Sequence, residues 1–443
     1  YLLDRGGGPG GSGVVIAYDP RTGSEEFAEE SALVLAAAGI PVYVFRGIRP
    51  TPLLSYAVRS LGAQGGIVVT ASHNPPVYNG YKVYGPNGGQ LLPTEADDIG
   101  KRAAAAHNYL DPPGDLAAPV RSLGEEMDAR YIDDVEATVE QVIGAGVPRE
   151  SRKRLGIVFT PLHGTGYRLV PALLERLGFG DVTLVDEQCV PDGTFATVKS
   201  PNPEEPGAFD LSLVVAEELA SKGRRPDLLI ATDPDADRLG ACVWDGHDYR
   251  HLTGNQVGVL LADALISARA ALGIDMSDCV LMKSIVSTEM VHPLCDPHGI
   301  KVIDTLTGFK YIGAKMDELE DVSRQFIMGF EESCGYLAGD LARDKDAVMA
   351  AALVACAGAA AAASGSSLWQ RLNELYASHG HYLERLVTVP VSAAQGPGRA
   401  MQALRSAPPA DVGGFAVIEV RDFLTGKATS GDGARVRPIG LPT

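Results

Sequence analysis

Residues 227–238 read DLLIATDPDADR, a short apolar run that ends in three alternating aspartates. The apolar run predicts a buried strand, and the polar residues predict a loop directly after it. The arrangement recurs twice, because residues 66–75 read GIVVTASHNP and residues 325–335 read QFIMGFEESCG. Open α/β sheets bind ligands beyond the carboxyl ends of their strands. The three stretches therefore predict a repeated α/β unit with a functional loop at one strand end of each copy.

Short β-branched runs alternate with helical patterns through most of the remaining chain, which is typical of parallel α/β sheets. We therefore predict an α/β fold with three similar mixed α/β domains and a smaller, incomplete C-terminal α+β domain. The predicted domains are residues 1–152, 153–250, 251–375 and 376–443. The predicted strands are 14–17, 42–45, 66–70, 156–160, 182–185, 227–231, 280–283, 301–304, 325–328, 383–389 and 417–421, and the clearest predicted helices are 25–38, 254–272 and the Ala-rich, buried 347–363.

Composition limits the classes of function. With 45% hydrophobic and 21% charged residues, the 443-residue chain has the composition of a folded soluble protein. Its net charge of −18 argues against nucleic acid or an anionic membrane as a general partner, so an anionic substrate would need a local basic pocket. The six cysteines are scattered and no secretory signal precedes the Gly-rich start, which predicts a cytoplasmic protein with reduced thiols.

The aspartates at positions 233, 235 and 237 predict a metal site, and we call residues 233–238 the metal loop. Alternating carboxylates on an extended loop can converge on a hard cation, and Mg²⁺ is the ion we expect. An EF-hand starting at Asp233 is excluded, because its sixth and twelfth residues would be Arg238 and Trp244 instead of glycine and an acid. A phosphatase with a nucleophilic aspartate stays open as an alternative, although it would give residues 70–75 no role.

Residues 70–75, the serine loop, offer a second reactive group. Ser72 has His73 beside it and Pro75 to stiffen the turn, so its hydroxyl could serve as a nucleophile or phosphate carrier. A turn serine beside a solvent-facing histidine is the commoner explanation of such a dipeptide. A phosphate carrier gains weight because phosphoryl transfer needs a metal to neutralise charge, and the metal loop offers one.

Other polar residues have both a functional and a structural explanation. Lys82 and Lys310 could bind phosphate or lie on the surface. Glu331 and Ser333 suit sugar hydroxyls, although Ser333 could be a cap, and we call residues 331–335 the sugar loop. Arg343 and Lys345 could bind substrate or begin a solvated helix.

Taken together, these segments resemble the α-D-phosphohexomutase superfamily, in particular its phosphoglucomutase-2-like branch that includes phosphopentomutases. The resemblance covers about residues 13–443 and rests on the serine, metal and sugar loops and on residues 305–313. Branch-like features are PLHGTG at 161–166 and VKSPNPEEP at 198–206.

The resemblance implies four domains around a central active-site cleft, and a mechanism. Phosphorylated Ser72, with its phosphate on Mg²⁺, would donate to a sugar monophosphate and regain phosphate from the resulting bisphosphate. A bisphosphate such as glucose 1,6-bisphosphate would act as activator, and the enzyme would be a monomer or homodimer. The implied site comprises Ser72, His73, Lys82 and Arg238 for catalysis, with Lys82 or His73 for proton transfer; Ser72, Asp233, Asp235 and Asp237 for the metal; and Thr307, Gly308, Lys310, Glu331, Ser333, Arg343 and Lys345 for the substrate.

Both ends depart from the family pattern. The chain starts with Tyr1-Leu2-Leu3-Asp4-Arg5 instead of a Gly-Thr-Ala-Gly-Leu-Arg segment, and it stops at Thr443 before the family's Arg-x-Ser-Gly-Thr-Glu-Pro phosphate loop. We expect either that parts of the natural protein are missing here or that phosphate is gripped poorly. The leading hypothesis is a mutase for glucose phosphates. Mannose, ribose or deoxyribose phosphate, a Mg²⁺-dependent sugar phosphatase, and an inactive sugar-phosphate-binding protein are the alternatives.

Overall fold

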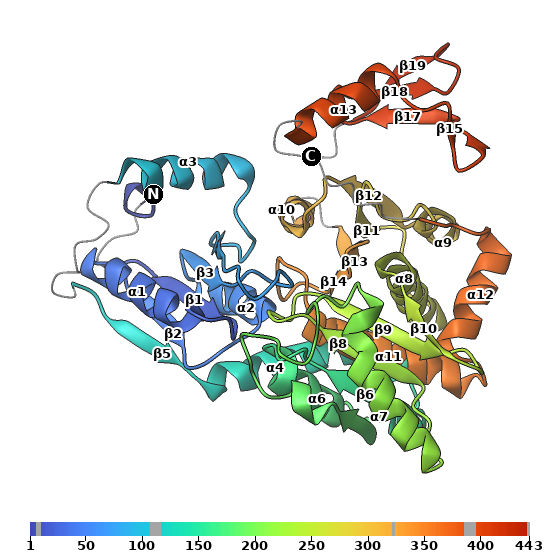
Figure 1. The fold of residues 1–443 in the computed structure, drawn as a ribbon, viewed down its shortest axis with the longest axis horizontal. Coiled ribbons are helices and arrows are strands. Elements are labelled where there is room, and N and C mark those ends of the chain that lie inside the picture. The colour runs from blue at the N-terminus through green and yellow to red at the C-terminus, as the bar shows by residue number, and fades with distance from the viewer. Residues whose placement is uncertain (6–9, 107–116, 321–323, 385–395, 441–443) are drawn as a thin grey trace.

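The computed structural model describes residues 1–5, 10–106, 117–320, 324–384 and 396–440. Three α/β units follow one another along the chain, and a smaller C-terminal part lies beyond the third (Figure 1). We number the units by their sheets: β1–β5, β6–β10 and β11–β14. The predicted fold class is confirmed.

The three sheets share one plan. In each unit the first strand lies between the second and the third, the three run parallel, and a fourth strand pairs antiparallel with the third. The sheet orders are β4-β3-β1-β2-β5, β10-β9-β8-β6-β7 and β12-β11-β13-β14. The serine, metal and sugar loops all follow the third strand of their unit, so one topology delivers one loop from each unit.

The bounds of the elements follow the apolar runs of the sequence closely. In the first unit they are β1 Val14–Tyr18, α1 Ser24–Ala37, β2 Val42–Phe45, α2 Thr51–Leu61, β3 Gly65–Val69, β4 Tyr81–Tyr84, α3 Pro93–Ala105, β5 Val120–Leu123 and α4 Glu125–Val142. In the second they are α5 Arg149–Arg154, β6 Gly156–Thr160, α6 Gly166–Arg176, β7 Asp181–Leu184, α7 Asp210–Ser221, β8 Leu228–Thr232, β9 Leu239–Trp244 and β10 Tyr249–Leu252. In the third they are α8 Gly254–Ala271, β11 Cys279–Ser284, α9 Val291–Cys295, β12 Lys301–Thr305, α10 Phe309–Glu320, β13 Gln325–Glu331, β14 Gly335–Ala338, α11 Ala347–Ala363 and α12 Leu368–His379.

Two predicted elements need comment. The strand predicted at 325–328 is longer, because β13 extends to Glu331, so this carboxylate stands at the end of a strand instead of in a free loop. Residues 385–389 of the strand predicted at 383–389 lie outside the described residues. The domain boundaries stay predictions.

Helix α11 joins the units. Its small side chains are buried over most of its length, and the helix contacts α5 and α6 of the second unit as well as α8. Alanine allows this close approach because it carries only a methyl group. Within the described residues no single helix could span a membrane, and only α11 with α12, bent by 82°, passes such a test as a pair.

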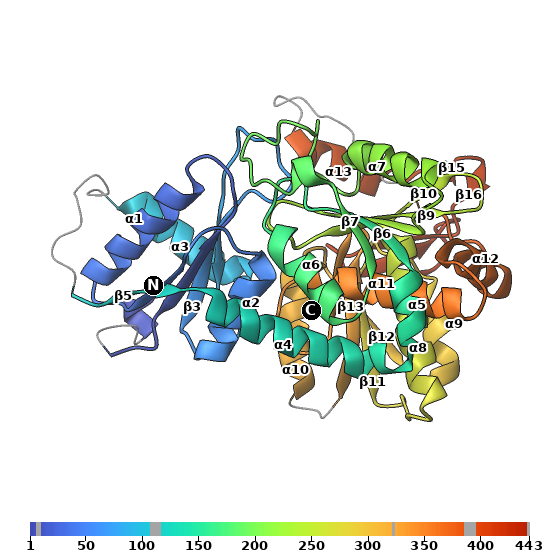
Figure 2. The same cartoon turned by 90° about the horizontal axis from the view of Figure 1, so that it is seen from below.

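The largest hydrophobic cluster draws residues from all three units, including Val15, Phe159 and Leu281. Helix α4 contributes to it through Tyr131 and contacts α2, α6, α8 and α11 (Figure 2). The units therefore share a core, which fixes the positions of their loops.

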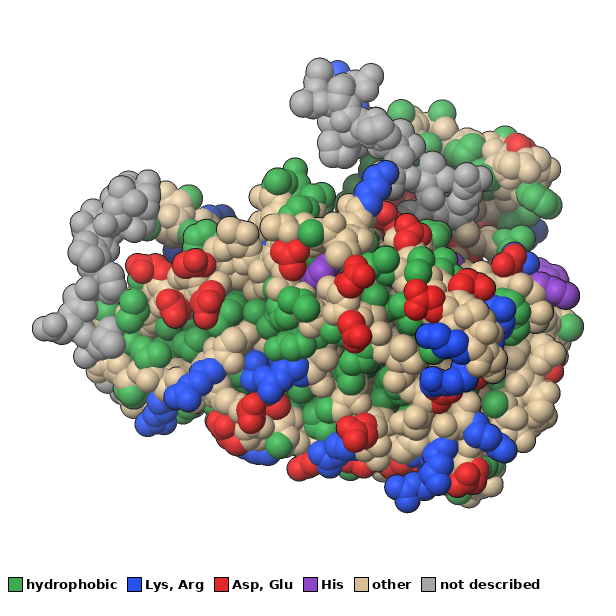
Figure 3. Space-filling model, turned by 60° about the horizontal axis from the view of Figure 1, so that its bottom comes forward, with side chains coloured by type: hydrophobic (Ala, Val, Ile, Leu, Met, Phe, Trp, Pro, Cys, Tyr) green, Lys and Arg blue, Asp and Glu red, His purple; other side chains and the backbone are tan. Residues whose placement is uncertain are grey.

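The C-terminal part contains α13 Gly396–Ser406, β15 Asp411–Val412, β16 Phe415–Ala416, β17 Glu419–Asp422, β18 Lys427–Ser430 and β19 Val436–Pro438. Ala428 is buried, whereas large apolar side chains such as Phe415 and Ile418 are exposed. On the face of the molecule in Figure 3, basic side chains are interspersed with acidic ones.

Candidate active site

The serine and metal loops meet where the first and second units touch. The Ser72 hydroxyl donates a hydrogen bond of 2.6 Å to Asp233 Oδ2, and both residues are buried. Ser72 follows β3 and Asp233 follows β8, so the contact joins equivalent positions of two units. The Ser72 hydroxyl and the acidic cluster are thus adjacent, as the predicted chemistry requires.

Asp233, Asp235 and Asp237 can present carboxylate oxygens within 4.8 Å of one another. All three are buried, and one oxygen each of Asp235 and Asp237 (Oδ1) has no hydrogen-bond partner. Burial and the two neighbouring carboxylates raise the pKa of Asp233 well above its ordinary value. A buried cluster of like charges with unpaired oxygens fits a hard divalent cation, which prefers oxygen ligands.

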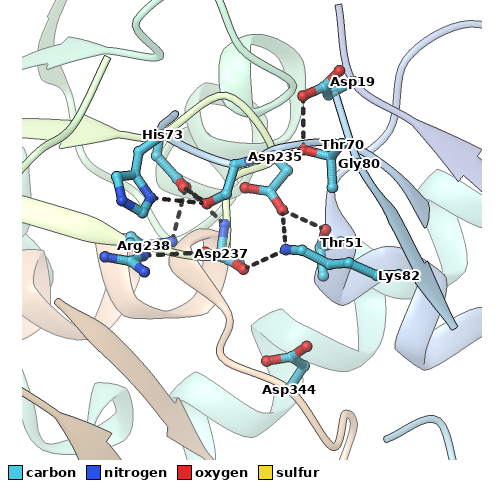
Figure 4. Close-up of polar contacts among 12 residues, drawn as sticks. Asp19, Thr51, Thr70, His73, Gly80, Lys82, Asp235, Asp237, Arg238 and Asp344 are labelled. Carbon is cyan, nitrogen blue, oxygen red and sulfur yellow. Dashed lines mark hydrogen bonds and ion pairs between the residues drawn. The ribbon is translucent and has the colours of Figure 1, made fainter. Parts of the chain in front are cut away.

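Two lysines contact the metal loop (Figure 4 shows Lys82). Lys82 Nζ lies 2.9 Å from Asp235 Oδ2 and 3.3 Å from Asp237 Oδ2, and Lys345 Nζ lies 3.0 Å from the same oxygen of Asp237. Burial alone would lower the pKa of Lys82, but Asp235 and Asp237 outweigh it and raise that pKa. Burial also opposes ionisation of Asp235, yet Lys82 lowers its pKa overall. Both groups are therefore charged at neutral pH.

Arg238 and His73 lie on the other side of Asp237 (Figure 4). Arg238 forms an ion pair with Glu204, and its Nε is 3.9 Å from Asp237 Oδ1. His73 Nδ1 lies 3.3 Å from Ser72 Oγ. Burial, helped by Arg238, lowers the pKa of His73 to about 4, so this imidazole is neutral at pH 7.

The sugar loop lies beside the metal loop. Arg238 and Gly335 form a β-bridge, and the Leu239 amide donates to Cys334 O at 3.0 Å. Glu331 is buried and accepts a hydrogen bond of 2.6 Å from the amide of Gly308, which brings two predicted substrate residues together. Ser333 is half-buried, and Thr307 is exposed.

Arg343, for which a substrate-binding role is predicted, lies in ion pairs with carboxylates. Its side chain is fully buried, and its guanidinium lies 2.6 Å from Asp317 Oδ1 and 2.6 Å from Asp340 Oδ1. Asp317 Oδ2 also accepts a bond of 2.7 Å from Asn87 of the first unit. We call Arg343, Asp317, Asp340 and Asn87 the arginine clasp. It joins the first and third units, and its guanidinium forms ion pairs with carboxylates.

Lys310 is also placed apart from the aspartates. Its Nζ lies 5.5 Å from the ring centre of Tyr311. Its side chain lines a cavity of about 790 Å³ whose other described walls come from the chain start, the first unit and α10, and include none of the three aspartates.

Sequence reasoning missed three residues of this cluster. The Thr51 hydroxyl donates to Asp235 Oδ2 at 2.8 Å, Asp344 Oδ2 accepts from the Tyr84 hydroxyl at 2.8 Å, and Glu204 pairs with Arg238. Asp344 lies between the two basic residues that were singled out, and Glu204 lies within the quoted 198–206 segment. Thr51 gives no local signal, because only the contact between units gives it a role.

Comparison with known proteins identifies the family. Models described as phosphoglucomutase/phosphomannomutase, alpha/beta/alpha domains I, II and III match residues 2–110, 129–246 and 253–379. The chain belongs to the phosphoglucomutase/phosphomannomutase family. It is 37% identical over 442 residues to a phosphoglucomutase of Staphylococcus epidermidis, covering 97% of this chain and 77% of the relative.

Solved structures of this family have a similar fold. A candidate phosphomannomutase of Thermus thermophilus aligns with a TM-score of 0.68 and 27% identity, covering 86% of this chain and 77% of that chain. Parafusin, a phosphoglucomutase of Paramecium in an open form, aligns with a TM-score of 0.66 and 18% identity, covering 86% of this chain and 69% of that chain. The protein is thus a mutase with an acidic site fit for a metal, in a family that is generally Mg²⁺-dependent.

Proposed function

We propose that this mutase interconverts hexose 1-phosphates and hexose 6-phosphates, with glucose phosphates preferred, through a phosphate carried on Ser72. The observation that supports the proposal is the 2.6 Å hydrogen bond between the Ser72 hydroxyl and Asp233 of the acidic cluster. The preference for glucose rests on the phosphoglucomutase of S. epidermidis at 37% identity.

Asp233, Asp235 and Asp237 would hold Mg²⁺. When bound, the ion would neutralise negative charge on the transferring phosphoryl group. Lys82, Lys345 and Arg238 supply further positive charge around the same point, and in phosphoryl transfer such positioning and charge stabilisation provide most of the catalysis.

Ser72 gives its phosphate to the free hydroxyl of the sugar monophosphate, and the bisphosphate then turns and returns its other phosphate to Ser72. In the return step the Oγ–P bond forms as the bond between the sugar oxygen and phosphorus breaks, so Ser72 loses its proton and the sugar oxygen gains one. His73 suits that proton, because it is neutral at pH 7 and its Nδ1 lies 3.3 Å from Oγ. Lys82 remains the alternative for proton transfer on the sugar side. Glu331 and Ser333 would hold the sugar hydroxyls in both orientations.

The proposed activator and cellular location rest on the sequence. A sugar bisphosphate would prime Ser72, and the scattered cysteines, all six free thiols in the described residues, suit a cytoplasmic enzyme. A phosphomannomutase is the second candidate, because the T. thermophilus protein at 27% identity is described as one.

A coupled assay tests the substrate. Glucose, mannose, ribose and deoxyribose 1-phosphates are each supplied with catalytic glucose 1,6-bisphosphate, and we expect the largest kcat/KM for glucose, by about 10-fold or more. Faster turnover of mannose 1-phosphate would select the second candidate. Stoichiometric release of free phosphate without isomerised sugar would instead indicate a phosphatase.

The Ser72→Ala variant tests the carrier in the same assay. We expect kcat to fall by at least about 1,000-fold, because the nucleophile is removed. Normal turnover with the bisphosphate present would show that another residue carries the phosphate.

A further inference from the structure

The serine loop has a backbone conformation that must be held from outside. Ser72 has φ of 52°, in the left-handed region that residues with a Cβ rarely adopt. Gly80 approaches the loop closely, since a Cβ on it would lie 2.5 Å from Thr70 O. The side chains that surround the loop therefore decide where the Ser72 hydroxyl points.

Thr70 connects the loop to the end of β1. Its hydroxyl accepts a hydrogen bond of 2.8 Å from the Ser72 amide and donates one of 2.7 Å to Asp19 Oδ2 (Figure 4 labels Thr70 and Asp19). Both residues are about 1% exposed, so water cannot replace either bond. Asp19 also accepts from the Ser24 hydroxyl at 2.8 Å, which fixes its carboxylate.

Arg21 holds the backbone on the other side of the loop. Its guanidinium donates to the carbonyl oxygens of Ser72 and Asn74, both at 2.5 Å, and to those of Pro75 and Tyr78, both at 2.9 Å. The side chain is fully buried, and its Nε lies 3.1 Å from Asp19 Oδ2. One cation thus binds four carbonyls, a geometry that the shorter, single-centre lysine cannot reproduce.

The second unit covers this arginine. The Phe195 ring lies 4.9 Å from the guanidinium carbon of Arg21, within cation–π range. Gly193 packs so closely against the first unit that a Cβ on it would lie 2.4 Å from Pro20 O and 2.9 Å from Arg21 Cα. The second unit, which also carries the metal loop, therefore packs directly on Arg21.

We propose that Asp19, Arg21 and Thr70 form a clamp of positioning residues that holds Ser72 in its left-handed conformation and aims its hydroxyl at Asp233. The inference rests on the proposed function, because it assigns these residues a role in transfer through Ser72. None of the three touches the acidic cluster through a recorded hydrogen bond. Their effect is thus on the placement of Ser72, and we expect it in kcat more than in KM.

Thr70→Val tests the clamp, because valine keeps the shape of threonine and removes the hydroxyl. We expect kcat to fall about 10- to 100-fold with KM within about 2-fold, as for a misplaced reactive group. Phosphate incorporation into Ser72 from glucose 1,6-bisphosphate, followed by intact mass, should slow by the same factor. Thr70→Ser keeps the hydroxyl and should restore both rates to within about 3-fold of the native protein.

Thr288→Val is a matched control. Thr288 is also buried, and its hydroxyl accepts from the amide two residues ahead, that of Met290 at 3.2 Å, outside the clamp. The control should also lower the melting temperature, by less than Thr70→Val because one recorded hydrogen bond is lost instead of two, and it should leave kcat unchanged. Equal kcat for Thr70→Val, Thr70→Ser and the control would overturn the inference.

Arg21→Lys is a second test of the clamp if Thr70→Val does not fold. A folded Arg21→Lys protein should lose kcat and slow phosphate incorporation, whereas native rates would overturn the clamp. Ser72→Ala distinguishes failure of the proposed clamp from failure of Ser72 as the proposed phosphate carrier. If Ser72→Ala is inactive and the clamp variants are normal, only this inference fails; if Ser72→Ala is active, the proposed carrier fails.

Discussion

Two charged clusters tie the first unit to the others, and they differ in how completely their buried atoms are paired. The metal loop brings three aspartates together, and two of them, Asp235 and Asp237, each have one oxygen without a hydrogen-bond partner. In the arginine clasp, Arg343 pairs with Asp317 and Asp340, and within the described residues no buried side-chain atom of the clasp lacks a hydrogen-bond partner. A buried oxygen without a hydrogen-bond partner lowers the stability of the folded protein, so its presence indicates a ligand-binding site. Pairing of the buried atoms indicates a structural role instead.

Two basic residues that are close in the sequence, Arg343 and Lys345, belong to different clusters. Arg343 and Lys345 belong to the same short charged segment, yet Arg343 turns into the clasp and Lys345 reaches Asp237. A sequence pattern shows that both are basic. Only the packing of the third unit against the other two decides which one faces the chemistry.

The largest expected effect follows removal of one acid from the metal-loop cluster. Asp237→Asn takes away a ligand oxygen with its charge, so we expect Mg²⁺ affinity to fall by at least about 100-fold, with kcat falling in parallel. Calorimetric titration with Mg²⁺ measures the affinity directly. Unchanged affinity would mean that Asp237 is not a ligand.

Asp317→Asn makes the matched change in the clasp. It removes one of the carboxylates that pair with the buried guanidinium of Arg343 in the described residues. Because Asp317 is partly exposed, we expect the free energy of unfolding to fall by about 2 to 3 kcal/mol, less than for a fully buried pair. Urea denaturation measures this loss. The Mg²⁺ affinity of the folded variant should match that of the native protein. A loss of affinity as large as that of Asp237→Asn would contradict the structural role of the clasp.

Asp346 gives a smaller, pH-dependent test, because it is a buried acid whose recorded partners include no cation. Its Oδ1 accepts from the Met349 amide at the start of α11 and its Oδ2 from the Tyr131 hydroxyl, and burial raises its pKa from 3.8 to about 6. Between these values the folded state binds more protons than the unfolded chain, so this residue's contribution to stability falls as pH rises.

Asp346→Asn removes that dependence. Relative to the native protein, the variant should gain about 2 kcal/mol in unfolding free energy between about pH 4.5 and pH 7. Urea denaturation at the two pH values gives the difference. A difference that does not change with pH would contradict the raised pKa.

The sequence predicted the repeated units and their loops well, since strands such as β2 and β6 are continuous apolar runs with clear ends. It could not predict which loops touch. Thr51 and Asp235 are 184 residues apart and meet only through the docking of two units. Asp19 and Arg21 do carry a sequence signal, because they directly follow β1 at the same sheet edge as the serine loop, where open α/β sheets bind ligands.

The most direct test of the account is to locate the phosphate on the protein. After incubation with glucose 1,6-bisphosphate, peptide mapping by mass spectrometry should find a single phosphoryl group on Ser72, and adding glucose 1-phosphate should remove it with formation of bisphosphate. A phosphoryl group on another residue, or steady turnover with Ser72 never modified, would contradict the account.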